Sequence, residues 1–440
     1  MDSEHEWLTG LRYEDLWAYI KTQKGNNEAQ RSYNAGIGAL LNEINKVPQF
    51  RGKISPDDVD YAFKEALEKI KEPLSRTGKR KLEAILRKWM GVERDYDFHF
   101  DLGWLIGFPV GFQFGYGELR PFSRLPRMNR PYVERGFEMA AARLKTPARI
   151  DFAPSEVERW FLCIRQRTIG WHNAAERADF LATRSLAAYE LVTGVAEIES
   201  WSLATPPRHD LVVVCHDRKR TGGRYHARPP LQLVINFPGS GFDELMNKMT
   251  RLMRNENRTE IENRIMAVVE IFAMLQGGVQ LEAKYLLKVI SLEALFLSED
   301  DRDYLGYRLA EKIAFLLGDD KLWMAITYER LPHLGFSGNL RELGDQYIDD
   351  KFAETKKSDA RRRLNREVVR LYRKRSAFAH QQRRNLESLI TPYDYDMVSW
   401  LLRLSVVKML SLTERGVTHL RKRSDDDPSS FDQLVEKLKY

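Results

Sequence analysis

The sequence predicts a mainly α-helical protein with an α+β N-terminal portion and a C-terminal helical bundle. Three observations support this prediction. Helical patterns fill the first ninety residues or so, aromatic runs of alternating polarity fill the middle, and helical patterns return after Pro238. Hydrophobic residues make up 43% and charged residues 30% of the 440 positions, as in a globular chain. At about 100–200 residues per domain, this length predicts two or three domains.

The first region, residues 1–95, is predicted to be helical. Residues 27–47 and 56–91 contain few helix-breaking residues. Ser55, which is followed by a proline, is typical of a helix start, with serine as the cap and proline in the first turn. Pro73 and the glycine that follows it indicate a turn between two helices within the second stretch.

The middle region, residues 96–240, is predicted to be an α+β domain. Aromatic residues and glycines alternate over 96–122, which favours strands with bends or bulges. A helix is expected from about Ser155. The remaining expected elements are a helix over 174–193 and strands over 211–217 and 231–237, joined by a hairpin loop or a longer connection.

The C-terminal region, residues 258–420, is predicted to be entirely helical, and residues 421–440 to form a tail. The run of helices begins just before this region. Its expected members cover 242–256, 258–276, 281–298, 305–317, 358–376 and 394–414.

The positive charge of the chain is concentrated in one segment. The sequence has 70 Lys or Arg against 63 Asp or Glu, a net charge of +7. Residues 361–384 hold ten basic residues and one glutamate, a net charge of +9, so the remainder carries −2. If the protein binds nucleic acid, this segment is where we expect the contact.

The composition also excludes several classes of protein. Two cysteines, Cys163 and Cys215, cannot build a disulfide framework. The sequence has no signal-peptide pattern and no run near the roughly 18 apolar residues of a spanning helix. We therefore expect a cytoplasmic protein that does not enter a membrane. Cys215 lies near His209, His216 and His226, but their spacing matches no familiar zinc pattern, so no metal or other cofactor is expected.

The pattern Arg-x4-His occurs three times, at 94–99, 167–172 and 375–380. The first lies in a predicted strand, where residues five apart point to opposite faces. The second contains a glycine at a helix boundary, so both are interpreted as structural. The third, RSAFAH, lies inside the +9 segment at the end of a long helical pattern. A local break there would let Arg375 and His380 converge.

An acidic residue in the apolar helix over 281–298 needs an explanation. Glu293 shares a face with apolar side chains, among them Val289, Ile290 and Leu297, by its i±3 and i±4 spacing. A carboxylate on such a face is costly without a partner. Arg375 or His380 is a candidate partner. A partly exposed glutamate, or one paired with a purely structural arginine, is an equal alternative.

Three motifs occur in order in the C-terminal region: SLEALF at 291–296, RLAEKIAFLL at 308–317 and RSAFAH at 375–380. Together they resemble the Apea-like branch of the HEPN superfamily. Its members have an apolar helix with a Leu-Glu core, a second helix of the Arg-Leu-Ala type and a basic helix ending in Arg-x4-His. The resemblance covers residues 258–420 only.

The resemblance implies a HEPN-type helical bundle that forms a homodimer. Two Arg-x4-His motifs would then face each other in one composite site. The implied activity is that of a metal-independent endoribonuclease with Arg375 and His380 as catalytic residues, supported by Glu293 and Ser376. Its implied role is an RNA-cleaving effector in phage defence or as a toxin. A separate hypothesis is that residues 1–240 sense a trigger ligand or protein, because this region is large and an unregulated nuclease would be costly to a cell.

Two positions depart from the family pattern. Ser376 follows the arginine, where many members have Asn, Asp or His, and Gln381 follows the histidine, where glycine is common. The alternative function is therefore a catalytically silent module that binds RNA, a nucleotide or a protein partner. Unless they only form a solvated face, neighbouring basic side chains would follow the RNA backbone: Arg366, Arg370, Arg373, Lys374, Arg383 and Arg384.

Overall fold

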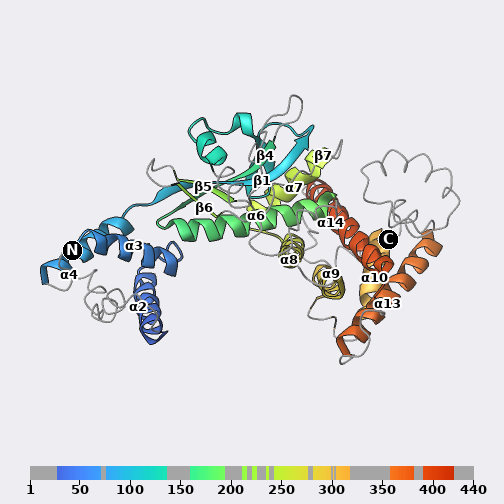
Figure 1. Ribbon diagram of the computed structural model, residues 1–440. Helices are drawn as coiled ribbons and strands as arrows, with labels where there is room; N and C mark the ends of the chain where they lie inside the picture. The colour runs from blue at the N-terminus through green and yellow to red at the C-terminus, as the bar shows by residue number, and fades with distance from the viewer. Residues whose placement is uncertain are drawn as a thin grey trace.

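The protein is mainly α-helical with an α+β portion, and its regions lie in a row (Figure 1). Helices α2 to α4 occupy one end, a sheet with a long helix lies in the middle, and a group of helices forms the other end. The computed structural model describes residues 27–70, 76–135, 159–193, 211–215, 221–224, 234–236, 242–275, 281–298, 301, 304–317, 357–380 and 390–420.

The N-terminal helices have a hydrophobic core of their own. They are α2 (Asn27–Lys46), α3 (Pro56–Glu68) and α4 (Arg76–Met90), as the sequence predicts. Leu40, Phe63 and Leu86, one from each helix, are buried together in a cluster that also includes Ile169, the residue after β4 (Arg159–Thr168). The helical prediction for this region is therefore confirmed over the described residues.

One buried carboxylate fastens these helices to the middle region. Asp58 is 1% exposed and accepts hydrogen bonds from the Ser55 hydroxyl at 2.9 Å and from the backbone N–H groups of His172 and Asn173 at 2.8 and 2.9 Å. The last two groups belong to the first turn of α6 (Trp171–Thr193). A Cβ at Gly170 would lie 2.0 Å from the Asp58 carboxyl carbon, so glycine is required for this close approach.

The middle region contains one sheet of seven strands. In the sheet the order is β2-β3-β4-β1-β5-β6, and β7 pairs with β1 in parallel while the other pairs are antiparallel. The strands are β1 (Arg94–Ile106), β2 (Phe112–Phe114), β3 (Gly117–Pro121), β4 (Arg159–Thr168), β5 (Leu211–Cys215), β6 (Thr221–Arg224) and β7 (Val234–Asn236).

The glycines in the aromatic run allow tight turns and close packing, as the sequence predicts. Gly115 has a φ of +57°, and a Cβ there would lie 2.4 Å from the Ser185 hydroxyl of α6. Its N–H donates to Thr250 Oγ1 at 3.0 Å, and its carbonyl accepts from Arg254 at 2.9 Å. The β2–β3 hairpin thereby contacts both α6 and α7 (Phe242–Arg254).

The helix expected from about Ser155 is wrong from residue 159 onward, where the chain forms β4. Leu162 of this strand is fully buried on one face of the sheet. On the other face Arg165 pairs with Asp95 of β1 at 3.0 Å. Because these partners are distant in the chain, the local sequence pattern did not indicate the strand, whose pairing depends on tertiary context.

Among the described residues, six helices follow the sheet at the positions that the sequence predicts. They are α7 (Phe242–Arg254), α8 (Glu260–Met274), α9 (Leu281–Phe296), α10 (Leu305–Leu317), α13 (Lys357–His380) and α14 (Pro392–Leu420). None of the helices in the described ranges has the length and apolar character that crossing a bilayer requires.

One hydrophobic core runs from the sheet into the C-terminal helices. Phe98 of β1 and Leu186 of α6 belong to the same buried cluster as Leu295 of α9. Arg184 of α6 also forms an ion pair with Glu270 of α8. The predicted boundary between the middle and C-terminal regions is therefore crossed by packing and by charge pairing.

Candidate functional site

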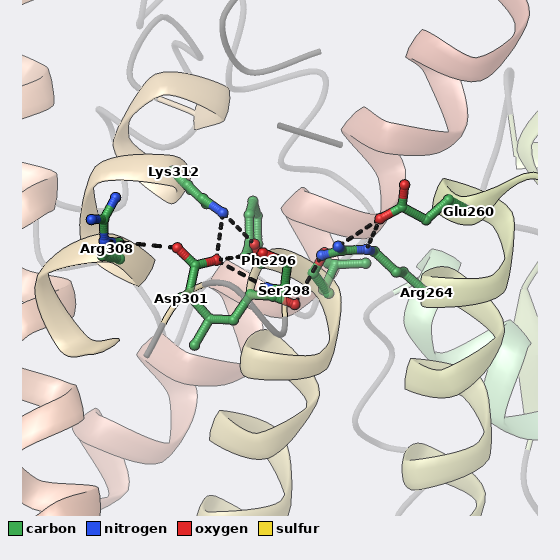
Figure 2. Close-up of polar contacts among 9 residues, drawn as sticks. Glu260, Arg264, Phe296, Ser298, Asp301, Arg308 and Lys312 are labelled. Carbon is green, nitrogen blue, oxygen red and sulfur yellow. Dashed lines mark hydrogen bonds and ion pairs between the residues drawn. The ribbon is translucent and has the colours of Figure 1, made fainter. Parts of the chain in front are cut away.

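The C-terminal end of α9 is held by cationic side chains from two neighbouring helices (Figure 2). Arg264 of α8 donates to the carbonyl oxygen of Leu297 at 3.0 Å. Lys312 of α10 donates to the carbonyl oxygen of Phe296 at 3.2 Å. Cations at this end satisfy free carbonyl groups and oppose the partial negative charge of the helix. Glu293, one turn earlier, is therefore carried by a well-anchored segment.

Asp301 completes the connection between α9 and α10 (Figure 2). Its carboxylate lies 2.8 Å from Lys312 Nζ and accepts hydrogen bonds from the Ser298 N–H and hydroxyl at 2.9 and 3.1 Å. Burial by itself raises the pKa of Asp301, but the bonds from Lys312 and Ser298 outweigh it and lower the pKa. The carboxylate is therefore charged at neutral pH and links the residues after α9 to α10 through Lys312.

Helix α13 is attached to α14 through a buried carboxylate. Asp394 is 0% exposed and accepts hydrogen bonds from Arg370 and Lys374, both at 2.6 Å, and from the Thr391 N–H at 2.9 Å. Burial alone would raise the pKa of Asp394. The bonds from Lys374, Thr391 and Arg370 outweigh burial and lower the pKa to about 2.

Glu293 and Arg375 meet between α9 and α13. Arg375 Nη2 lies 3.2 Å from Glu293 Oε2, and the two side chains are 25% and 18% exposed. The prediction that a cationic residue faces Glu293 is confirmed, and the partner is the arginine of RSAFAH. Arg375 Nε and Glu293 Oε1 are buried without a hydrogen-bond partner in the described structure. Each of the two side chains is therefore partly exposed and has one buried polar atom that makes no hydrogen bond within the described residues.

Tyr372 lies beside this pair and is fixed by a glycine. Arg375 Cζ is 5.7 Å from the centre of the Tyr372 ring. Burial, and next the Glu293 carboxylate, raise the pKa of the Tyr372 phenol. A Cβ at Gly306 of α10 would lie 2.6 Å from the Tyr372 ring. Glycine at this position thus allows the first turn of α10 to contact the ring.

Helix α13 continues without interruption through RSAFAH to His380. The local break that was expected to bring Arg375 and His380 together is therefore wrong. Residues five apart on one α-helix are separated by about 140° around its axis. The two residues of one chain thus point in different directions from α13. The side chain of His380 itself lies outside the described part.

The other predicted site residues fall into three groups. Arg370 and Lys374 pair with Asp394, and Arg370 also bonds to Glu367, so these two cations hold the fold. Arg366 and Arg373 are exposed on α13, while Ser376 is partly exposed. Arg383 and Arg384, and Gln381 before them, lie outside the described residues.

A groove runs between α10 and α13, which are neighbours in Figure 1. It consists of two adjoining hollows of about 560 and 310 Å³, which share Asn365 and Arg366. The larger hollow is lined by Tyr307, Arg366, Arg373 and Ala377 among others, and the smaller by Glu311 and Phe315 among others. We call this feature the α10–α13 groove.

Gly306, Asp394 and Tyr307 were missed by the sequence reasoning. Asp394 had a local signal, because Thr391 precedes a proline and lies three residues before the aspartate, which is typical of a capped helix start. Gly306 and Tyr307 had none, because their role depends on contact with α13, which is distant in sequence.

The other two Arg-x4-His patterns have structural surroundings. Arg94 donates to the carbonyl oxygen of Ile169 at 3.3 Å. His99 is 2% exposed, lies 3.2 Å from the Cys163 sulfur, and is 3.0 Å from Asn129. Burial lowers the pKa of His99 to about 4.

The pattern at 167–172 is divided between two elements. Arg167 belongs to β4 and lies 3.3 Å from the Glu93 carboxylate. His172 belongs to α6 and lies 4.0 Å from Asp57. Arg167 on β4 and His172 on α6 therefore pair with different carboxylates.

The structure describes only one member of the Cys215 group. Cys215 ends β5 and its side chain is not described, while His209, His216 and His226 lie outside the described residues. Within the described ranges no group of three His, Cys, Asp or Glu side chains could hold a metal ion.

Comparison with known proteins identifies no relative of this chain. No family model, no curated protein and no solved structure matches it.

Proposed function

We propose that this chain is a metal-independent endoribonuclease of the HEPN type, with Arg375 and His380 as catalytic residues in a site made by two copies. The proposal is carried by the contact of Arg375 with Glu293 at 3.2 Å. The glutamate belongs to SLEALF and the arginine to RSAFAH. Two motifs that define the resemblance, 82 residues apart, therefore meet in one partly open polar cluster.

The chemistry needs a proton acceptor, a proton donor and positive charge on the phosphate. In RNA the 2′-oxygen attacks the adjacent phosphorus, the bond to the 5′-oxygen breaks, and the products carry a 2′,3′-cyclic phosphate and a 5′-hydroxyl. The 2′-hydroxyl loses a proton and the 5′-oxygen gains one. Histidine suits both transfers because its unperturbed pKa lies near 6.5. Arg375 would bind the phosphate oxygens through its planar guanidinium.

The continuous helix α13 supports a site built from two copies. Arg375 and His380 of one chain are separated by about 140° on the helix, so they do not converge on one phosphate by themselves. A second α13 in antiparallel orientation would bring its His380 toward the first Arg375. Each homodimer would then contribute two histidines, one for each proton transfer.

The packing between the sheet and the bundle supports regulation from the N-terminal part. Arg184 on α6 pairs with Glu270 on α8, and one core includes both regions. A ligand or protein that shifts the sheet would therefore act directly on the helices next to α9. This would keep an RNA-cleaving effector, in defence or as a toxin, inactive until it is triggered.

One observation favours a different function, a catalytically silent binding module. The charge of Arg375 is already opposed by Glu293, and Arg370 and Lys374 are engaged by Asp394. Less positive charge is then available for a phosphate in the transition state than the sequence suggests. Such a bundle would bind RNA, a nucleotide or a protein partner without cleaving it.

The deciding experiment is incubation of the purified full-length protein with labelled total RNA in EDTA. The wild type should cleave and His380→Ala should not, with 2′,3′-cyclic phosphate ends on the products. His172→Ala is the matched control, because it removes the histidine of another Arg-x4-His pattern. Its cleavage should equal that of the wild type.

The outcomes separate the two functions. Equal cleavage by the wild type and His380→Ala would refute the assignment of His380. RNA binding without cleavage by either protein, in the presence and absence of candidate triggers, would support the binding module.

A further inference from the structure

Two large aromatic side chains are exposed at the start of α10. Tyr304 is 80% exposed and Tyr307 is 52% exposed. The Tyr307 N–H donates to the Tyr304 carbonyl at 2.8 Å, so the two residues are adjacent on the first turn. Neither ring is needed for the core, because both lie largely outside it. Exposed aromatic rings next to arginines are the usual platform for unstacked nucleobases.

The backbone at Tyr304 is also unusual. Its φ is +55°, and it is the one non-glycine residue with a positive φ in the described part of the chain. A bulky side chain is uncommon in this conformation, which favours Gly or Asn. Such strain is found where the rest of the fold imposes it, often at binding sites. Gly306, two residues later, holds this turn against Tyr372.

Two arginines of α13 line the same hollow of the α10–α13 groove as Tyr307, and Tyr304 lies one turn before Tyr307. Arg373 Nη2 donates to the Tyr307 hydroxyl at 3.0 Å, and both residues line the larger hollow together with Arg366. Arg366 and Arg373 are two turns apart, about 10 Å along the helix. Over the residues that the structure describes, neither has a carboxylate partner.

Within the described part of the chain, the nearby carboxylates are engaged elsewhere and do not oppose the charge of these two arginines. Glu367 and Asp394 are bonded to Arg370, and Asp394 also to Lys374. Glu311 lies in the smaller hollow, beyond Arg366. The larger hollow therefore combines an aromatic edge with positive charge, which complements a phosphate backbone that carries bases.

We propose that Tyr304 and Tyr307 hold an unstacked base of single-stranded RNA, while Arg366 and Arg373 bind phosphates of the same strand. This inference rests on the proposed function, because it names the form of RNA that the site takes and where the strand lies. A single strand fits better than a duplex, because its bases are free to stack on aromatic side chains.

The register of α13 connects this groove to position 380, one of the two proposed catalytic positions. Position 380 follows Arg373 by seven residues and Ala377 by three, so it lies in the same row of the helix. A strand bound along Arg366 and Arg373 would therefore run toward residue 380. The platform would set which nucleotide precedes the scissile phosphate.

The test uses the full-length chain carrying His380→Ala and a short, unstructured, fluorescently labelled RNA in EDTA. Binding is followed by anisotropy over a series of salt concentrations, with the same RNA annealed to its complement as the duplex probe. The added change Tyr304→Gly or Tyr307→Leu should weaken single-strand binding by about tenfold, since a stacking ring is lost. The parent should bind the single strand more tightly than the duplex.

Matched variants separate stacking from charge. Tyr307→Phe keeps the ring and should bind within about twofold of the parent, in line with the stacking account. Arg366→Gln or Arg373→Gln should reduce the slope of log affinity against log salt by about 0.7, whereas the tyrosine variants should leave it unchanged. Tyr304→Gly should unfold at a temperature no lower than the parent, because glycine tolerates the positive φ. Tyr304→Asn provides a second variant that tolerates this backbone.

Unchanged single-strand binding by both Tyr304→Gly and Tyr307→Leu, or equal binding of the duplex, would overturn the platform. So would the absence of any RNA binding. Cleavage assays with His380 present keep this failure apart from that of the proposed function. Loss of cleavage in His380→Ala with normal binding by the tyrosine variants leaves the nuclease and removes the platform. RNA binding that depends on the tyrosines, without any cleavage, would keep the platform and refute the nuclease.

Discussion

The same five-residue spacing of arginine and histidine has opposite surroundings in the sheet and in the bundle. In β1, Arg94 bonds to backbone carbonyl groups and His99 is buried among Cys163 and Asn129. In α13, Arg375 is partly exposed and faces a carboxylate from another helix. The same spacing thus contributes to packing in the strand β1 and to an accessible polar cluster on the helix α13.

Secondary structure therefore decides which contacts a short sequence pattern can make. In a strand, residues five apart lie on opposite faces, so one of them enters the core whenever the sheet is covered. On a helix they are about 140° apart, so both can stay near the surface and serve different partners. Function can then be tested by changing the same residue type in both regions.

The largest expected effect is the loss of RNA cleavage in the Arg375→Ala variant. Loss of the guanidinium removes a charged donor to the phosphate and should lower the cleavage rate by about a hundredfold or more. Arg94→Ala removes the same group in the sheet and should leave the rate unchanged. Initial rates on a labelled RNA in EDTA measure both. Equal loss in the two variants would indicate a general effect of charge or folding and not a role at the site.

The second effect is a stability difference that depends on pH and comes from the sheet. Burial lowers the pKa of His99 to about 4, so below its unfolded value of about 6.5 the unfolded chain binds a proton that the folded chain excludes. Stability should therefore fall as pH drops from 6.5 toward 4, by about 3 kcal/mol at most from this residue. Chemical denaturation at several pH values should show that the free energy of unfolding depends less on pH in His99→Gln than in the wild type. An unchanged slope would contradict this account.

A smaller effect is expected where α13 meets α14. The pKa of Asp394 in the folded protein is about 2, below the usual value of 3.8. Its charge therefore contributes stability above about pH 4 that is lost as the pH falls toward 2. Asp394→Asn should lower the free energy of unfolding by about 2 kcal/mol at pH 7. The difference from the wild type should shrink in acid. A constant difference across this range would point to packing and not to charge.

Much of the fold was predictable from local pattern, because most helices carry their own signals. The helices α7, α8, α10 and α13 combine apolar and charged residues at helical spacing, and the nearly all-apolar α9 made Glu293 stand out as a charge that needs an explanation. The strand β4 was not predictable, because its partners Asp95 and Phe98 come from a distant strand. Gly306 was missed for the same reason: its importance is a contact with Tyr372, which no local pattern contains.

The bonding of Asp58 has a practical consequence for dissecting the chain into fragments. By sequence it belongs to the N-terminal helices, yet it caps the first turn of α6 through His172 and Asn173. A fragment that begins at residue 96 would leave two N–H groups of α6 without their acceptor. It would also remove the Asp58 carboxylate that lies against Gly170. A fragment that retains α3 with the sheet would keep that cap. Because α3 shares a buried core with α2 and α4, all three helices belong on the same fragment as the sheet.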